Sequence, residues 1–406
     1  MLPPILEIYL VWHPSDTEGE TILGWLLEHF HGTPYAGLIG GAVEVYARSA
    51  PWAPGSDAPR PLPCDTPLPY DLPSARVTAI VPIIGTRLAR AVDDESSDWR
   101  RYLETMRAAA DAPGNPVGVF PLRLHGTADG AIGQLLGDLQ ELNRASAEDR
   151  GTLCRELSQA IAQLVNDPFG NRLTVFISHT KRHSPDEEPD YVDDLVTRVR
   201  SMISNTHLRA YFDAADVQAG SDWDHELRSN AASNALLAIR TDLYAGREWC
   251  QREFLIAKQA GMPIVTLNAV RRSEERGSFL MDHVPIVGYD HRDDDASAHS
   301  IEEALNLLVD GALRRAVWGL QEAELSSRGV DWAPLHAPEP ATIIPWLLAN
   351  KERAMADGRI LIMHPDPPLG PDENGVIDQL FQVAGVKAPI DVVTPRTYAS
   401  RGGGEL

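Results

Sequence analysis

Short apolar runs alternate with segments of helical periodicity along most of the chain. In the middle third, runs rich in Val, Ile and Leu predict buried strands, at 173–178, 208–212, 235–239, 263–267 and 284–289. Between them, apolar residues recur every three or four positions and predict helices, at 191–203, 247–260 and 301–313. Such alternation is typical of a parallel sheet that has helices on both of its faces.

The first third of the chain repeats this alternation. Its apolar runs predict strands at 5–12, 42–47, 77–84 and 117–124, and its periodic segments predict helices at 21–30, 99–110, 132–142 and 153–164. The stretch 49–73 is rich in proline and is therefore expected to be a loop.

The last part of the chain has a weaker pattern. Four prolines mark 319–345 as a connector, and beyond it we predict helices at 343–355 and 376–383 and strands at 359–364 and 389–393. We therefore expect three segments: an α/β domain at 1–168, a second at 169–318, and a linker with a small α/β segment at 319–406. The expected fold class is two flavodoxin-like, doubly wound parallel sheets, whose ligands lie beyond the carboxyl ends of the strands.

The composition restricts the classes of partner. The formal net charge is −22, so the surface repels phosphate backbones and we expect no nucleic-acid partner. Cys64, Cys154 and Cys250 are far apart, which argues against a disulfide framework and against a thiolate metal site. There is no signal-peptide pattern, and no apolar run approaches the roughly 20 residues of a membrane helix. We expect a cytoplasmic protein with no membrane partner and no bound metal.

The most informative chemistry lies in the segment 247–253, REWCQRE. Trp249 and Glu253 are four residues apart on a predicted helix, so they share a face and lie one turn apart. The helix follows a buried strand. The pair is therefore expected to present an aromatic ring and a carboxylate together at the edge of the sheet.

These residues resemble a Toll/interleukin-1 receptor (TIR) domain, particularly those of bacteria and plants. The matching pieces are VFISHTKR at 175–182, LRAYFDAADVQAGSDW at 208–223, LLAIRTDLYAGREWCQREFLIAK at 236–258 and PIVTLN at 263–268. The resemblance implies that 213–222 is the BB loop of that family. It also implies that Glu253 is the catalytic glutamate found in the family's NAD-cleaving members.

Cleavage of the bond between ribose and nicotinamide suits a single carboxylate. The nicotinamide leaves as a neutral molecule, so no general acid is needed, unlike in ordinary glycosidases. Glu253 can hold a ribose hydroxyl and stabilise the positive charge that develops at the anomeric carbon. Trp249 can flank the cationic ring, and Lys181 and Arg182 can meet the pyrophosphate. NAD+ is a substrate here, and no cofactor is expected; the remaining expected contacts to it are Ser178, Asp213, Trp223, Tyr244 and Arg247.

Each of these residues also has a structural explanation. Trp249 can pack against neighbouring helices, and Lys181 and Arg182 can be ordinary solvated charges. Trp223 can pin the BB loop. From spacing alone Glu253 is a surface carboxylate, and only the surrounding motif favours catalysis.

The first third looks like a degenerate copy of the middle third. Its pieces EIYLVWHPSD, VEVYARSAPW and VTAIVPIIGTRLARAVDDESSDWRRYLETM occur in the same order. The residue four positions after Trp99 is Leu103, however, and the acid is Glu104, about 100° further around the helix. We expect this domain to be non-catalytic; an unrelated α/β domain is the alternative.

The sequence therefore predicts an NAD+ glycohydrolase that releases nicotinamide and ADP-ribose or a cyclic variant. The resemblance implies a role in bacterial defence against phage and activation by self-association through TIR domains. The alternatives are a non-catalytic TIR scaffold that recruits other TIR or sensor proteins, and a receptor gated by a signal. The catalytic interpretation requires Glu253 to open to a cleft, whereas burial of the acid favours the adhesive role.

Overall fold

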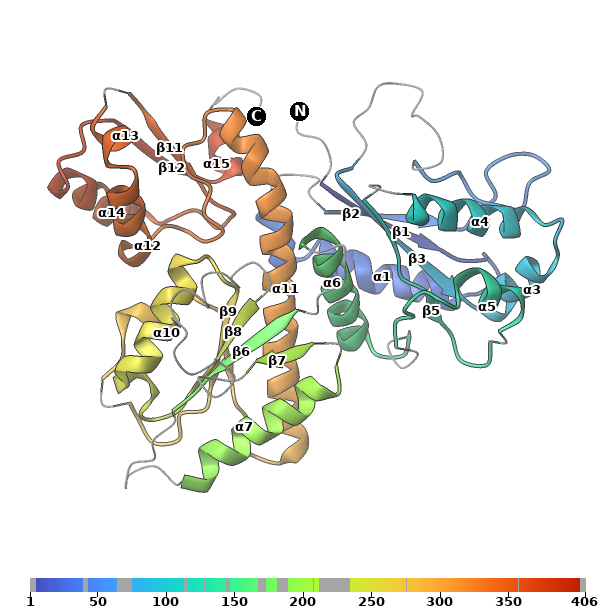
Figure 1. Ribbon diagram of the computed structural model, residues 1–406, viewed down its shortest axis with the longest axis horizontal. Coiled ribbons are helices and arrows are strands. Elements are labelled where there is room, and N and C mark those ends of the chain that lie inside the picture. Colours follow the sequence, from blue (N-terminus) through green and yellow to red (C-terminus); the bar gives the residue numbers. More distant parts are fainter. Residues whose placement is uncertain are drawn as a thin grey trace. The chain divides into compact units, whose positions relative to one another are not determined.

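The computed structural model divides the chain into two compact units, Met1–Pro168 and Phe169–Gly404 (Figure 1). The residues that it describes are 5–38, 43–63, 75–112, 116–127, 129–143, 147–166, 173–180, 189–206, 208–211, 234–274, 276–356 and 358–401.

The first unit is built on a parallel sheet. Its strands are β1 (Leu6–Val11), β2 (Val43–Arg48), β3 (Val77–Ile84) and β4 (Val117–Val119), in the order β2-β1-β3-β4, and β5 (Leu122–Arg123) also pairs with β3. Every residue of β3 is buried, as expected for the apolar run VTAIVPII at the centre of a sheet. The predicted strand 117–124 is two short strands, because Pro121 between them has no N–H to donate to the ladder.

Helices cover this sheet. They are α1 (Glu18–Phe30), the short α2 (Thr33–Ala36), α3 (Thr86–Asp93), α4 (Asp98–Asp111), α5 (Gly130–Leu136) and α6 (Arg150–Asn166). The sequence did not predict α3. The free N–H groups at the start of α3 are bound by the buried carboxylate of Asp16. It accepts hydrogen bonds from the backbone N–H of Arg87 (3.0 Å) and of Leu88 (2.9 Å).

The second unit has a parallel sheet of five strands. These are β6 (Thr174–Ser178), β7 (Arg209–Tyr211), β8 (Asn234–Arg240), β9 (Ile264–Asn268) and β10 (Ile286–Gly288), in the order β10-β9-β8-β6-β7. All neighbouring pairs are parallel. The predicted doubly wound order is confirmed for this sheet, and the direction of the strand order reverses between β6 and β8. Such a reversal leaves a crevice at the carboxyl ends of the two strands.

Both faces of this sheet are covered. Helices α7 (Pro189–Ser204) and α11 (Asp294–Ser327) pack on one face with Val175, Leu237 and Val265, whereas α10 (Glu248–Gln259) packs on the other with Phe176, Leu236 and Ala238. The alternation of these strand residues between the two cores follows from the two-residue period of a strand.

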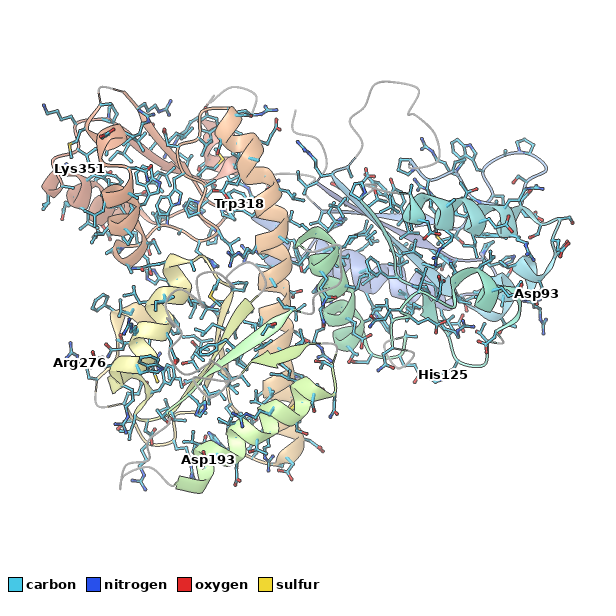
Figure 2. All side chains as sticks on the ribbon, viewed as in Figure 1. Asp93, His125, Asp193, Arg276, Trp318 and Lys351 are labelled. Atoms are coloured by element: carbon cyan, nitrogen blue, oxygen red, sulfur yellow. The ribbon has the colours of Figure 1, made fainter. Side chains whose placement is uncertain are left out.

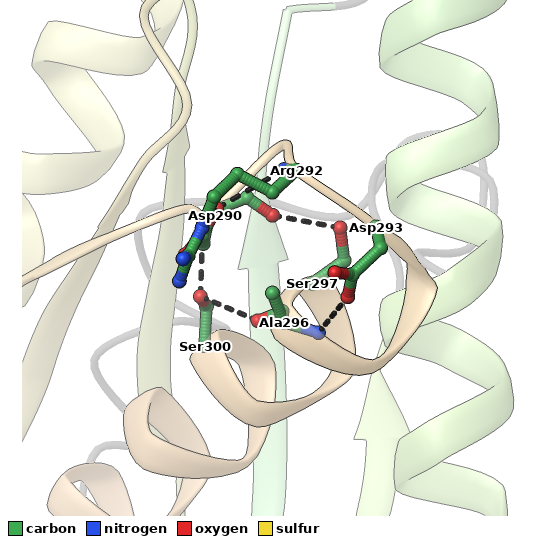
Figure 3. Close-up of polar contacts among 6 residues, drawn as sticks. All are labelled: Asp290, Arg292, Asp293, Ala296, Ser297 and Ser300. Atoms are coloured by element: carbon green, nitrogen blue, oxygen red, sulfur yellow. Dashed lines mark hydrogen bonds and ion pairs between the residues drawn. The ribbon is translucent and has the colours of Figure 1, made fainter.

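Helix α11 is much longer than predicted, and residues 319–327, which we expected to begin a connector, belong to it. The buried positions Leu313, Val317, Gln321 and Leu325 continue its apolar face at spacings of four. At its start the Asp293 side chain accepts the Ala296 N–H at 2.8 Å (Figure 3). At its end Gly329 adopts φ 88°, which allows the Val330 N–H to reach the carbonyl of Leu325 and close the helix.

The remaining elements are α12 (Pro340–Ala349), α13 (Lys351–Met355), β11 (Ile360–Met363), α14 (Pro371–Val383), β12 (Ile390–Val393) and α15 (Pro395–Ser400), with β11 and β12 parallel. The predicted single helix 343–355 is wrong, because Asn350 leaves helical geometry (φ −115°, ψ 30°). Two strands cannot enclose a full core by themselves, so this segment needs contacts with α11. Trp318 of α11 (Figure 2) provides one of them. Its indole N–H donates to the carbonyl of Ala333 at 2.8 Å.

Candidate functional site

Three elements meet at the carboxyl ends of β6 and β8, where the strand order reverses. Ser178 is the last residue of β6, Tyr244 begins the short 3-10 turn η2 (Tyr244–Gly246) after β8, and Glu253 lies in the second turn of α10. All three side chains are buried, with 1%, 0% and 1% of their surfaces exposed. Residues from three separate stretches of sequence therefore form one polar cluster inside an otherwise apolar region.

The cluster is a chain of hydrogen bonds. Ser178 Oγ donates to Glu253 Oε2 at 2.5 Å, and the Ser178 and Tyr244 hydroxyl oxygens lie 2.7 Å apart. Burial is the main cause that raises the pKa of Tyr244 well above its usual value, and the neighbouring Cys250 and Glu253 raise it further. Tyr244 therefore remains a neutral hydroxyl donor over the whole physiological pH range.

The local sequence explains why Glu253 points inward. Cys250, Phe254 and Ala257 form the buried face of α10, and Glu253 lies within that face. The start of the helix is fixed by the Gln251 side chain, which donates to the carbonyl of Ala245 at 2.6 Å. The Cys250 thiol lies 3.7 Å from the carbonyl of His179, which ties the helix to the end of β6. These contacts fix the helix against the carboxyl ends of β6 and β8.

Trp249 and Glu253 are not presented together as the sequence predicted. The Trp249 ring is 37% exposed and lies beneath the guanidinium of Arg252, 5.8 Å from ring centroid to Cζ, whereas the Glu253 carboxylate is enclosed. Positions four apart differ by about 40° around a helix, and here the boundary of the packed core falls between them. Glu253 is 1% exposed and does not open to a cleft, which is the outcome that favours the adhesive role over catalysis.

The other predicted contact residues divide into two groups. Ser178 and Tyr244 are brought to Glu253, and Arg247 is the half-buried residue that precedes α10. Lys181, Arg182, Asp213 and Trp223 lie outside the described residues.

Several polar residues near the crevice were missed by sequence reasoning. Thr180 and Thr241 follow β6 and β8 and are buried, with their hydroxyl oxygens 3.5 Å apart. Arg240 is paired with Glu274, Nε to Oε1 at 2.6 Å, and hydrogen bonding to this carboxylate raises the pKa of Arg240. All but Glu274 end or immediately follow a strand, which is the signal that would have found them.

Among the described residues of the first unit, helix α4 carries no equivalent cluster. Trp99 is 2% exposed and packed in the core, whereas the carboxylate of Glu104 is exposed and paired with Arg100 at 3.0 Å. The ring and the acid lie on different sides of this helix, in line with the five-residue spacing.

Residues 175–305 match the family model described as a TIR domain. Over these residues the second unit is similar to a TIR domain. No curated protein matches the chain. Among solved structures, it is similar to a candidate tagatose-6-phosphate ketose/aldose isomerase of Clostridium novyi NT, with 10% identity over 78% of this chain and 79% of that one. The TM-score of 0.19 is too low for that likeness to bear on fold or function.

Two further observations concern possible ligands and membranes. Among the residues that the structure describes, no group of three or more His, Cys, Asp or Glu side chains is placed to hold a metal ion. Within the same ranges, no helix combines the length and the apolar character needed to cross a bilayer.

Proposed function

We propose that the TIR domain is an NAD+ glycohydrolase in which Glu253 is the catalytic carboxylate. The observation that supports this most is the placement of Glu253, bound by Ser178, at the crevice where the strand order of the sheet reverses. This is the position at which doubly wound sheets bind their ligands. The products are nicotinamide and ADP-ribose or a cyclic variant.

A buried carboxylate in a core destabilises the fold unless something offsets it. Moving an ionised group out of water is expensive, and an apolar residue on this face of α10 would pack at no such cost. Buried titratable groups that are retained together with hydrogen-bonding partners are characteristic of functional sites. The retained hydrogen-bonding partners of Glu253 support a functional site, whereas its burial by itself favours the adhesive role.

Catalysis then requires a step that uncovers the acid. We propose that association between TIR domains supplies it, so that NAD+ gains access to Glu253 only in the assembled state. The biological role proposed is bacterial defence against phage, through depletion of NAD+ or production of a nucleotide signal. The first unit, whose sheet order β2-β1-β3-β4 parallels β7-β6-β8-β9, is proposed to be a non-catalytic repeat that takes part in this association.

The test is the release of nicotinamide from NAD+ by the full chain over a series of protein concentrations. Glu253→Gln preserves the shape of the side chain and removes its charge, so we expect loss of activity by at least about a hundredfold. Glu104→Gln, at the corresponding helix of the first unit, is the matched control and should retain activity. Equal activity of wild type and Glu253→Gln would refute the catalytic assignment.

A second function is favoured by the 1% exposure of Glu253 itself. In this alternative the domain is a scaffold that binds other TIR domains, and the buried cluster only stabilises the fold. It predicts that the chain self-associates and yet releases no nicotinamide at any concentration, and that Glu253→Gln leaves the association unchanged.

A further inference from the structure

We propose that Tyr244 and Ser178 are positioning residues, which act through Glu253 by directing a fixed hydrogen bond at its carboxylate. This inference rests on the proposed glycohydrolase function and concerns the regulation of the same site. It assigns to Ser178 and Tyr244 a role different from contact with the substrate.

The direction of the chain follows from counting hydrogens. A serine hydroxyl has one hydrogen, and Ser178 gives it to Glu253 Oε2 at 2.5 Å. The contact of 2.7 Å between Ser178 and Tyr244 must therefore use the hydrogen of the tyrosine. The chain runs from the Tyr244 hydroxyl to the Ser178 hydroxyl to the carboxylate.

The donor role of Tyr244 does not change with pH in the working range. Burial raises the pKa of the Tyr244 phenol well above its usual value, so the tyrosine remains a donor. With Tyr244 donating, the serine hydrogen has no better acceptor than Glu253. Hydrogen bonds to an ionised acceptor are about twice as strong as neutral ones, and each bond in such a chain polarises the next. The arrangement therefore favours the ionised and oriented form of Glu253.

Two titratable groups close to Tyr244 are held by partners of their own. The titratable groups that act on Tyr244 besides Glu253 are Cys250 on α10 and Arg240 at the end of β8. The Arg240 guanidinium is bound by Glu274, and the Cys250 thiol faces the carbonyl of His179. The Ser178 hydroxyl donates directly to the carboxylate of Glu253.

Tyr244→Phe separates the hydrogen bond from packing, because phenylalanine keeps the buried ring and loses only the hydroxyl. Ser178→Ala removes the whole chain, and Ser178→Thr restores a hydroxyl at the same place. Tyr191→Phe is the matched control, since that hydroxyl of the same domain donates to the carbonyl of Ala269 at 3.0 Å, away from Glu253.

The experiment measures kcat and KM for nicotinamide release against pH, together with the melting temperature. We expect Tyr244→Phe to lower kcat about tenfold and to leave KM unchanged. The acid limb of the pH profile of kcat should move to higher pH, because loss of a hydrogen-bond donor favours the protonated form of Glu253. Ser178→Ala should lower kcat further than Tyr244→Phe does, whereas Ser178→Thr should have a kcat close to that of wild type. Tyr191→Phe should match wild type in kcat and in the pH profile. A lower melting temperature of Tyr244→Phe with an unchanged kcat and pH profile would show a merely structural role.

A second readout works without turnover. In protein carrying 13C at the glutamate carboxyl carbons, the Glu253 signal is identified by its loss in Glu253→Gln, and its titration is followed by NMR. We expect this titration to move to higher pH in Tyr244→Phe. An unchanged titration overturns the positioning role even if wild type is active, whereas an inactive wild type with a shifted titration overturns only the glycohydrolase assignment.

Discussion

Substitution of Lys258 by methionine should loosen the attachment of α12 to the helix that contains Glu253. Lys258 lies in the last turn of α10, and its ammonium is 2.8 Å from the Glu339 carboxylate at the start of α12. It also donates to the carbonyl of Asp282 at 2.6 Å. The two charged side chains are only 7% and 11% exposed, so this is a buried ion pair.

The burial of this ion pair sets the expected loss of stability in Lys258→Met. Methionine keeps most of the aliphatic stem but leaves the Glu339 carboxylate without its cation, and breaking a buried pair in this way costs about 3–5 kcal/mol. His283 lies beside Glu339, with Nδ1 3.5 Å from the carboxylate, so the acid keeps one polar neighbour and we expect the lower end, about 3 kcal/mol. Lys258→Met combined with Glu339→Gln removes the isolated charge and should recover more than half of the loss.

Native-state hydrogen exchange of α10 and α12 in the full chain, followed over a urea series, reports the free energy of opening of these helices. Lys351→Met is the matched control, because Lys351 is exposed at the start of α13 and should give a far smaller change (Figure 2). A loss below about 1 kcal/mol for Lys258→Met would place the pair among weak surface ion pairs and refute the reasoning.

Two other predictions concern the backbone and the buried phenol. Gly329→Ala should destabilise the chain by about 1–2 kcal/mol in thermal unfolding, because φ is 88° there and L-residues avoid this conformation. No atom lies near the added methyl group, so the loss reports the backbone alone. The control is Gly319→Ala, which has equal space inside α11 and should stabilise the chain. Because the folded pKa of Tyr244 is raised, its contribution to stability is complete below pH about 10, the unfolded value, and is lost as the pH rises further. Tyr244→Phe should therefore flatten the alkaline loss of stability, and a tyrosinate signal from Tyr244 in the folded protein would contradict this.

The periodicity of the sequence was sufficient to predict the sheet of the second unit. Five apolar runs become β6 to β10, and the central strands β6, β8 and β9 are apolar along nearly their whole length because they are buried on both faces. Ser178 and Tyr244 lie at or just after the ends of neighbouring parallel strands, which meet at one edge of the sheet. The sequence prediction was wrong about the end of α11. A domain boundary was placed at 318, but the buried face of the helix continues past it to Leu325.

The sequence by itself therefore determined the order of the elements, the parallel sheet and the residues that follow its strands. The tertiary structure alone decided which side of α10 is covered. Spacing gives the angle between Trp249 and Glu253 on the helix, but it does not locate the boundary of the core, which depends on β6, β8 and η2 packing against that helix. For the same reason only the folded chain shows that Ser178 binds Glu253 and that Lys258 binds Glu339, because these partners are 75 and 81 residues apart in sequence.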